Sequence, residues 1–263
     1  MPSLEDSILA ELLTAAEGHP EYHILPFRAL ASGRQYGRLY HLMRRHVPPG
    51  ASVLDWGAGS GHFSYFLLRA GYRATGYTLL DYRFDHLVSP AEYSLVRGDP
   101  ADPSRLPFPD RAFDAVVSVG VLEHVRETGG TEAASLEEIA RILRPGGLFL
   151  CYHFPNRASW VDRAARLFPG AHRHEYRYSR RDIERLNQGA GFTLLETGRY
   201  GALPRNGWHR LPRALRHSRP AADLWDALDA ALSVLLAPIC QNHFFVSRRD
   251  DGPDPMRRFE AAL

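Results

Sequence analysis

The segment with the clearest chemical meaning is a short acidic, glycine-rich turn. Glycine occupies every second position from Gly57 to Gly61, and Asp55 stands two residues before the first glycine. Glycine permits positive φ angles and lets a ligand approach the backbone closely. The dinucleotide fingerprint spaces its glycines G-x-G-x-x-G around a pyrophosphate, whereas the spacing here is D-x-G-x-G-x-G. An acid at this point would repel a pyrophosphate and suits a cationic amine; the alternative is an ordinary glycine turn.

Histidines are the candidate proton acceptors, because their unperturbed pKa is about 6.5. His153 follows an apolar run, and His124 lies in the segment Val121-Leu122-Glu123-His124-Val125. His172 and His174 alternate with tyrosines in a region that could line a pocket or form a solvated loop. A His-x-His pair without nearby carboxylates or cysteines is a poor metal site, so we expect no bound metal.

Apolar periodicity predicts the elements that position these residues. Short apolar runs bounded by turn residues predict seven strands, at residues 52–54, 73–78, 94–97, 113–119, 148–152, 192–196 and 243–247. Apolar residues at helical spacing predict helices at 3–17, 34–46, 62–70, 131–143, 180–188 and 222–236. The alternation predicts an α/β fold, with a doubly wound, Rossmann-like, mostly parallel sheet, N-terminal helices and a C-terminal helical cover. Ligands bind at the carboxyl ends of the strands in such sheets.

Further motifs, in order and at the expected distances, resemble the class I S-adenosylmethionine-dependent methyltransferases. The resemblance covers roughly residues 50–155 and is closest to the small-molecule enzymes that include the ubiquinone and menaquinone methyltransferases. Its motifs besides the glycine turn are Gly98-Asp99-Pro100-Ala101, residues 106–117, Val121-Leu122-Glu123-His124-Val125 and Arg141-Ile142-Leu143-Arg144-Pro145-Gly146-Gly147. The resemblance implies an enzyme with S-adenosyl-L-methionine as cofactor and a small molecule as methyl acceptor.

The resemblance also implies which residues bind the cofactor. Asp55 would hold the methionine amino group, the glycine turn would line the methionyl and ribose portion, and Asp99 would accept a hydrogen bond from the adenine amino group. The residues assigned to the cofactor site are Asp55, Gly57, Ala58, Gly59, Gly61, Thr78, Asp81, Asp99, Pro100 and Gly120.

The end of the second predicted strand departs from the family pattern. Family members usually have Asp or Glu there to bind both ribose hydroxyls, but the alignment places Thr78 at this position. Thr78 makes a single hydrogen bond at best, and Asp81 either takes the role or caps a helix beginning near Tyr82. Because of this departure, a non-catalytic cofactor-binding protein remains an alternative interpretation.

The implied chemistry is an in-line displacement in which the protein mainly aligns the acceptor with the methyl group. An oxygen or nitrogen acceptor also needs a base. His153 is the first catalytic candidate, unless it only fixes its loop, and His124 is the second. No Asn/Asp-Pro-Pro-Tyr/Phe segment follows the fourth predicted strand and no cysteine directly follows a proline. These absences argue against amine methylation of nucleic acids or proteins and against covalent base methylation, so we expect O-methylation of a small molecule.

Charge is distributed unevenly along the chain. All 32 basic residues are arginines, and residues 157–219 hold 14 Arg against 5 Asp and Glu, a net charge of +9 in a chain of net +2. This stretch and the apolar helix at 222–236 suggest a membrane-surface enzyme for a lipid or quinone, although packing of that helix on the sheet explains it more simply. An RNA-binding methyltransferase is a further alternative, but the arginines lack a regular aromatic platform.

The remaining composition indicates an ordinary globular protein, with 44% hydrophobic and 24% charged residues. Its two cysteines have no metal-ligand spacing, and neither a signal peptide nor a membrane-spanning run is evident. We therefore expect a cytoplasmic location. The expected organisation is a helical segment 1–47, a cofactor-binding core 48–155, an acceptor cover with the last strands 156–248 and a disordered tail 249–263.

Overall fold

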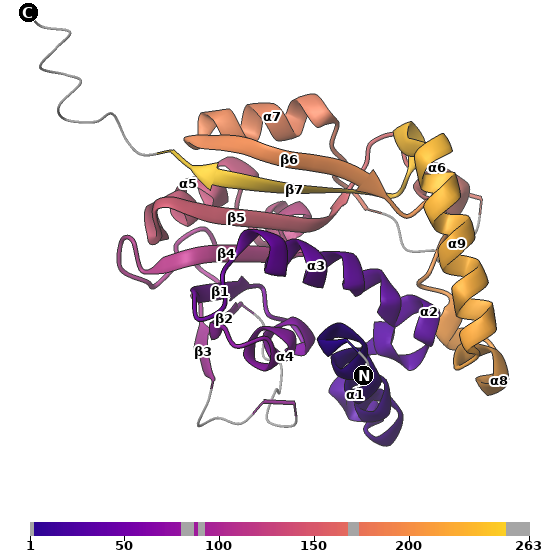
Figure 1. Ribbon diagram of the computed structural model, residues 1–263. Helices are drawn as coiled ribbons and strands as arrows, with labels where there is room; N and C mark the ends of the chain where they lie inside the picture. Colours follow the sequence, from indigo (N-terminus) through magenta and orange to yellow (C-terminus); the bar gives the residue numbers. More distant parts are fainter. Residues whose placement is uncertain (1–2, 80–86, 89–92, 168–173, 251–263) are drawn as a thin grey trace, which may run out of the picture.

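The computed structural model describes residues 3–79, 87–88, 93–167 and 174–250. Within these residues, seven strands form one sheet in the order β3-β2-β1-β4-β5-β7-β6 (Figure 1). The strands are β1 (Ser52–Trp56), β2 (Arg73–Thr78), β3 (Ser94–Arg97), β4 (Phe113–Val119), β5 (Leu143–Pro155), β6 (Phe192–Tyr200) and β7 (Asn242–Arg249). Strands β1 to β5 are parallel, and β7 is antiparallel to both of its neighbours. The predicted doubly wound, mostly parallel sheet is confirmed.

Helices cover both faces of this sheet. The α-helices of the described residues are α1 (Leu4–Gly18), α2 (Leu30–Gly33), α3 (Gly37–His46), α4 (His62–Arg69), α5 (Glu132–Ile142), α6 (Trp160–Ala165), α7 (Arg180–Gly189), α8 (Arg213–Arg216) and α9 (Arg219–Leu235). Successive residues of a strand point to opposite faces. On β4, Ala115 and Val117 therefore pack with α1, α3 and α4, whereas Val116 packs with α5 and α7.

Local sequence explains where several elements begin and end. α1 begins after Ser3 and α7 after Ser179, and each serine forms a capping box with an aspartate three residues later. β5 is longer than predicted, because it pairs with β7 as far as Pro155. The pairing is irregular between Cys151 and Phe154, and a bulge of this kind redirects the side chain between them.

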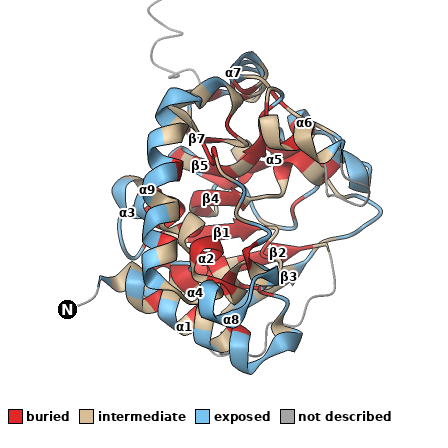
Figure 2. Cartoon of the chain, turned by 90° about the vertical axis from the view of Figure 1, so that its right-hand side faces the viewer, coloured by how far each residue is buried: buried red, intermediate tan, exposed pale blue. Residues whose placement is uncertain are grey.

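The packing of α9 differs from the expected one. The sequence predicts that the leucines of residues 222–236 pack on the sheet, but α9 lies at one end of the sheet beside α2 and α8 (Figure 1). The exposed fractions of its leucines are 62% for Leu224, 45% for Leu228 and 76% for Leu235. Much of α9 accordingly carries the colour of exposed residues in Figure 2. The helix was predicted correctly, and the face that it buries was not.

Ion pairs and a small apolar cluster, in which Ala222 and Trp225 pack with Trp208, hold the inner face of α9. Arg205 donates to Asp226 at 2.5 Å and to Asp229 at 2.9 Å, and Arg34 donates to Asp223 at 2.6 Å. Asp229 also accepts from the backbone N–H of Leu203 at 2.7 Å. The acidic face is turned inward because it meets two arginines there, and this leaves the leucines outside.

The segment after residue 155 contributes to the same sheet as the preceding one, since β7 lies between β5 and β6. Most of the tail predicted to be disordered, residues 251–263, lies outside the described residues. Among the described residues, no helix is both long and apolar enough to cross a membrane.

Candidate active site

The glycine turn connects β1 to α4 and depends on its glycines. Gly57, Gly59 and Gly61 have φ angles of +80°, +49° and +76°, a region that other residues rarely adopt. A Cβ on Gly57 would overlap the side chain of Val121, whereas one on Gly59 would meet nothing nearer than the Gly57 carbonyl at 3.7 Å. The backbone N–H groups of Gly57 and Ala58 both donate to the carbonyl of Tyr77 at 2.9 Å. The turn is thus fixed to β2 and open on the side of Gly59.

Asp55 lies beneath this turn and is only 1% exposed. Its carboxyl accepts a hydrogen bond from the Ser64 hydroxyl at 2.6 Å, and that hydroxyl lies 2.6 Å from the Tyr93 hydroxyl. Burial raises the pKa of Asp55 to about 7, although the hydrogen bonds from Ser64 oppose the shift. A cation placed beside Asp55 would favour its ionised form. A buried carboxyl under a bare glycine turn therefore fits a ligand with a cationic amine.

The ends of β2 and β3 bring two further candidates to the same edge of the sheet. Thr78 is buried, and its carbonyl accepts from the backbone N–H of Gly98 at 3.0 Å. Asp99 is exposed, and its carboxylate accepts from the backbone N–H of Ala101 at 2.8 Å. Pro100 is also exposed, and Asp81 lies outside the described residues. The roles of these residues toward a cofactor stay predictions.

A cavity of about 700 Å³ opens at the carboxyl ends of β4 and β5. Its walls come from these strand ends, from residues 25–38 and from residues 200–242. Four residues singled out in the sequence line it, namely Gly120, His124, His153 and His174. The charged side chains in its walls include Arg34, Arg38, Glu123, Asp162, Arg205 and Asp229. The cavity is therefore polar and charged.

His153 has a fixed orientation in this cavity. Its φ angle is +65°, and both its backbone N–H, at 2.9 Å, and its Nδ1, at 2.8 Å, contact the Tyr200 hydroxyl. The Tyr200 hydroxyl also contacts the Tyr152 hydroxyl, which donates to the Gln35 carbonyl at 2.8 Å. When Nδ1 of His153 donates the ring proton to the Tyr200 hydroxyl, Nε2 is the acceptor nitrogen of the neutral imidazole.

The surroundings of His153 also determine its charge. Desolvation lowers its pKa to about 3, and the neighbouring His62 and His174 contribute in the same direction. The expectation that its ordinary pKa of about 6.5 applies is therefore wrong. His153 is neutral at physiological pH and is a weaker base than the sequence suggested, but it keeps an acceptor nitrogen.

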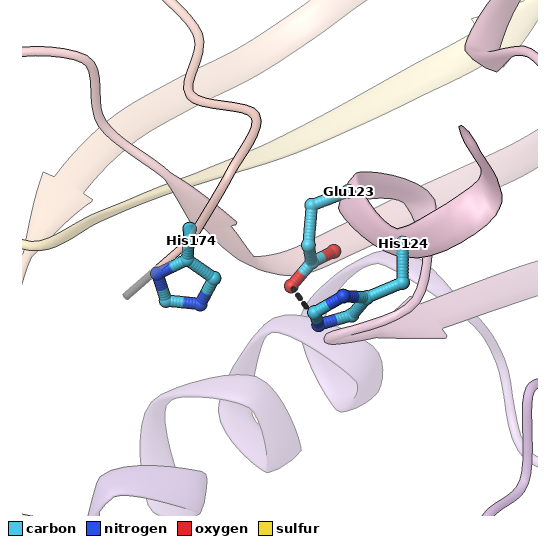
Figure 3. A group of neighbouring side chains, drawn as sticks. All are labelled: Glu123, His124 and His174. Atoms are coloured by element: carbon cyan, nitrogen blue, oxygen red, sulfur yellow. Dashed lines mark ion pairs between the residues drawn. The ribbon is translucent and has the colours of Figure 1, made fainter. Parts of the chain in front are cut away.

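Glu123, His124 and His174 form a cluster in the wall of the same cavity (Figure 3). Glu123 and His124 belong to a 3-10 helix, Leu122–Thr128, that follows β4, and His174 lies before α7. Glu123 is 2% exposed, and burial raises its pKa to about 8. Its Oε1 lies 4.0 Å from Nε2 of His124. His172, the other member of the His-x-His pair, lies outside the described residues.

The N-terminal segment links the glycine turn to the cavity. Tyr36 packs edge-on against His153, with 5.3 Å between ring centroids, and against His62, at 4.7 Å. His62 is the first residue of α4, and desolvation lowers its pKa to about 4. Sequence reasoning missed Tyr36, Tyr200 and Glu123. Of these three residues, only Glu123 gave a signal in the sequence, because it is an acid within the largely apolar segment 121–125.

Comparisons with known proteins agree with this geometry. A family model described as "Methyltransferase domain" matches residues 27–197. The chain is 37% identical over 122 residues to a fatty-acid O-methyltransferase of Mycolicibacterium smegmatis, covering 43% of this chain and 41% of that protein. It is 31% identical over 132 residues to a demethylmenaquinone methyltransferase of Tropheryma whipplei, covering 46% and 49%. The chain thus spans less than half the length of these two relatives.

A solved structure extends the similarity over nearly the whole chain. It is the 1,6-didemethyltoxoflavin-N1-methyltransferase of Burkholderia thailandensis with bound 1,6-didemethyltoxoflavin and S-adenosylhomocysteine. The TM-score is 0.53 at 18% identity, covering 95% of this chain and 92% of that one. At this identity the likeness establishes the fold alone.

Proposed function

The chain belongs to the methyltransferase-domain family, and from this premise we propose that it transfers the methyl group of S-adenosyl-L-methionine to an oxygen of a polar small molecule. The glycine turn supports the cofactor in this proposal, and the charged cavity supports the acceptor. The observation that carries the proposal is His153, which presents an acceptor nitrogen in a cavity at the carboxyl ends of β4 and β5.

The residues around the glycine turn fit the cofactor. Gly59 leaves open space in front of the backbone, and the buried carboxyl of Asp55 suits the cationic amino group. Thr78 and Asp99 are the proposed partners of the ribose and the adenine. When bound, the cofactor supplies a methyl group on a positively charged sulfur, whose C–S bond breaks with its electron pair going to sulfur as the acceptor oxygen forms the C–O bond.

The lining of the cavity favours a hydroxylated acceptor over a hydrocarbon chain. Both signs of charge are present in its walls, and three arginines, Arg34, Arg38 and Arg205, contribute to them. A hydrocarbon chain in this cavity would remove charged groups from water without hydrogen-bonding them, which is costly. A polar acceptor offers hydroxyl groups to the same side chains.

His153 supports oxygen as the methylated atom. Its Nε2 accepts a hydrogen bond from an acceptor hydroxyl and so aligns the oxygen. An oxygen that has gained a methyl group and still carries its proton is a strong acid, so even a weakly basic imidazole takes the proton. His153 then returns to its neutral form by releasing the proton to water.

Methyl transfer from isotope-labelled S-adenosylmethionine tests the proposal directly. Purified protein is incubated with hydroxylated acceptors, namely glycosides and phenols, and separately with a fatty acid and a demethylmenaquinone analogue. We expect methylated products only among the hydroxylated acceptors, with the label on oxygen by mass spectrometry. Carbon methylation of the quinone alone, or cofactor binding without turnover on any acceptor, would contradict the proposal.

The exposed leucines of α9 favour a second candidate, in which the acceptor is the polar headgroup of a lipid at an anionic membrane. Leu224, Leu228 and Leu235 face outward. The exposed Arg219 begins this helix, and the exposed Arg213 begins the preceding helix α8. An exposed apolar face flanked by arginines is typical of helices that lie in a membrane interface. The charged cavity suits a headgroup but not an acyl chain.

A further inference from the structure

Three side chains in the cavity wall have the composition of a metal site. Glu123, His124 and His174 each offer one ligand atom, and the three atoms lie within 4.8 Å of one another. Figure 3 shows the carboxyl group of Glu123 between the two imidazole rings. Two histidines and a carboxylate form the protein ligands of catalytic zinc sites and of non-haem iron sites.

Each histidine of the cluster also contacts a carboxylate outside it. Nδ1 of His124 lies 2.8 Å from Oε1 of Glu127, and Nδ1 of His174 lies 3.4 Å from Oδ1 of Asp162. Histidines that bind metals usually donate their second ring nitrogen to a carboxylate or carbonyl, which orients the ring. Both outer partners are therefore in the positions that a metal site requires.

Glu123 is the member whose environment calls for a ligand. Its side chain is 2% exposed, and among the described residues Oε2 has no hydrogen-bond partner. A buried carboxyl oxygen without a partner is costly, and such groups are rare unless an ion or water satisfies them. Glu123 is one of the residues that line the cavity.

We propose that Glu123, His124 and His174 bind one divalent transition-metal ion, of which Zn²⁺ is the probe, at the edge of the acceptor cavity. Ligands at 2.0–2.2 Å around a tetrahedral ion lie about 3.4 Å apart, so the three side chains close by roughly 1 Å when the ion binds. Three protein ligands leave a coordination position open toward the cavity. The sequence predicted no metal site, because a His-x-His pair lacks a carboxylate, and only the fold brings Glu123 and His124 to His174.

The role of this ion rests on the proposed function. An ion held by these three ligands would coordinate the acceptor hydroxyl at its open position and lower the pKa of that hydroxyl. The hydroxyl proton then leaves to water before or during transfer, and the acceptor oxygen becomes a better nucleophile. This contribution compensates for the weak basicity of His153 in the same cavity.

Zinc binding by the protein alone tests the site. Tag-free protein is stripped with a chelator and titrated with Zn²⁺ in a calorimeter, with no cofactor or acceptor present. We expect one ion per chain, at least tenfold weaker binding in Glu123→Gln and His174→Ala, and a 10- to 100-fold loss in Asp162→Asn, the usual effect of removing an outer partner. His209→Ala is the matched control, because His209 lines the same cavity outside the cluster, and it should bind as the wild type does.

The outcomes separate this proposal from the proposed function. Wild-type protein without a stoichiometric site, or cluster variants that bind as His209→Ala does, would overturn the metal site. Calorimetry of S-adenosylmethionine on the same samples reports cofactor binding independently, and thermal unfolding verifies that the variants are folded. Zinc binding without methyl transfer would instead contradict the proposed function and leave the metal site standing.

Discussion

At the scale of single residues, Asp55 couples ligand charge to a proton. Its pKa is about 7, raised by burial from an ordinary value of 3.8. Most of the population is therefore protonated below neutral pH. An ammonium group bound beside Asp55 favours the ionised carboxylate, so the proposed contact with the cofactor amine predicts that binding releases that proton.

Cofactor affinity should therefore rise with pH through about 7 and fall by up to tenfold per unit below it. Calorimetry at pH 6 in buffers of different ionisation enthalpy should detect proton release on binding. In Asp55→Asn, which has no carboxyl proton, the release and its pH dependence should be absent. An unchanged proton release in Asp55→Asn would show that the proton comes from another group and that Asp55 does not meet the amine.

His153 and Tyr200 make the second prediction at this scale. Because the pKa of His153 is about 3, its protonation should leave no inflection in the rate between pH 5 and 8. His153→Ala should lower single-turnover methyl transfer by about 10²–10⁴, with cofactor affinity unchanged. Tyr200→Phe removes the hydroxyl that contacts Nδ1 of His153 and should lower the rate about tenfold, the equivalent of one neutral hydrogen bond.

The pH profile distinguishes this account from ordinary base catalysis. An inflection near pH 6.5 that disappears in His153→Ala would mean that the imidazole titrates normally and is not desolvated as described. A wild-type rate in His153→Ala would leave His153 as a loop residue.

Sequence reasoning identified the glycine turn and Asp55 because their meaning is local. Each glycine of the turn has a positive φ, and spacing alone reveals this requirement. Glu123 and Tyr200 could not be found in the same way, since their roles depend on partners far along the chain. Tyr200 contacts His153 only because β6 and β5 both pair with β7, one on each side.

At the scale of elements, α9 separates helix formation from helix packing. Leucines at helical spacing predict an amphipathic helix, and the usual inference is that the apolar stripe faces the core. In α9 the polar face is turned inward instead, because Arg34 and Arg205 form ion pairs there with Asp226 and Asp229. Sequence spacing shows which residues share a face but not which face the rest of the protein meets.

The membrane candidate predicts the behaviour of this helix. In the triple variant Leu224→Ser, Leu228→Ser and Leu235→Ser, the free energy of unfolding should differ from that of the wild type by no more than about 0.5 kcal/mol per site, because substitutions at exposed positions have small effects. The variant should also lose association with anionic vesicles, which the wild type should show and which should weaken with salt. Absence of vesicle binding by the wild type would remove the membrane candidate, and concentration-dependent mass in light scattering would assign the leucines to a second copy.

At the scale of the whole molecule, the alternation of strands and helices predicted a mostly parallel seven-stranded sheet but not the order of its strands. The order β3-β2-β1-β4-β5-β7-β6 places β7, the last strand of the chain, inside the sheet. One consequence is that His243 is buried at 1% exposure, with Nε2 3.2 Å from the Tyr178 carbonyl. Burial and the positive charge of Arg199 lower the pKa of His243 to about 4.

His243 makes global stability depend on pH. The unfolded chain takes up a proton at this histidine below about pH 6.5, whereas the folded chain does so only below about 4. The contribution of neutral His243 to the free energy of unfolding is therefore fully present above pH 6.5 and is lost as the pH falls toward 4. Relative to His243→Gln, the wild type should lose at most about 3 kcal/mol of unfolding free energy across this window. Denaturant titrations measure it, with the exposed His41→Gln as control, and parallel curves for wild type and His243→Gln would contradict the burial of a neutral imidazole.

The measurement that bears most directly on the account is calorimetric titration of the protein with S-adenosylmethionine, compared between Gly59→Arg and Gly50→Arg. Both glycines have positive φ angles and no close neighbour in the way of a Cβ, so the two variants carry similar backbone strain. Only Gly59 lies in the turn that faces the proposed ligand. The account predicts stoichiometric binding by the wild type and Gly50→Arg, and none by a folded Gly59→Arg. Binding that survives in Gly59→Arg, or tight binding of NAD in place of S-adenosylmethionine, would contradict it.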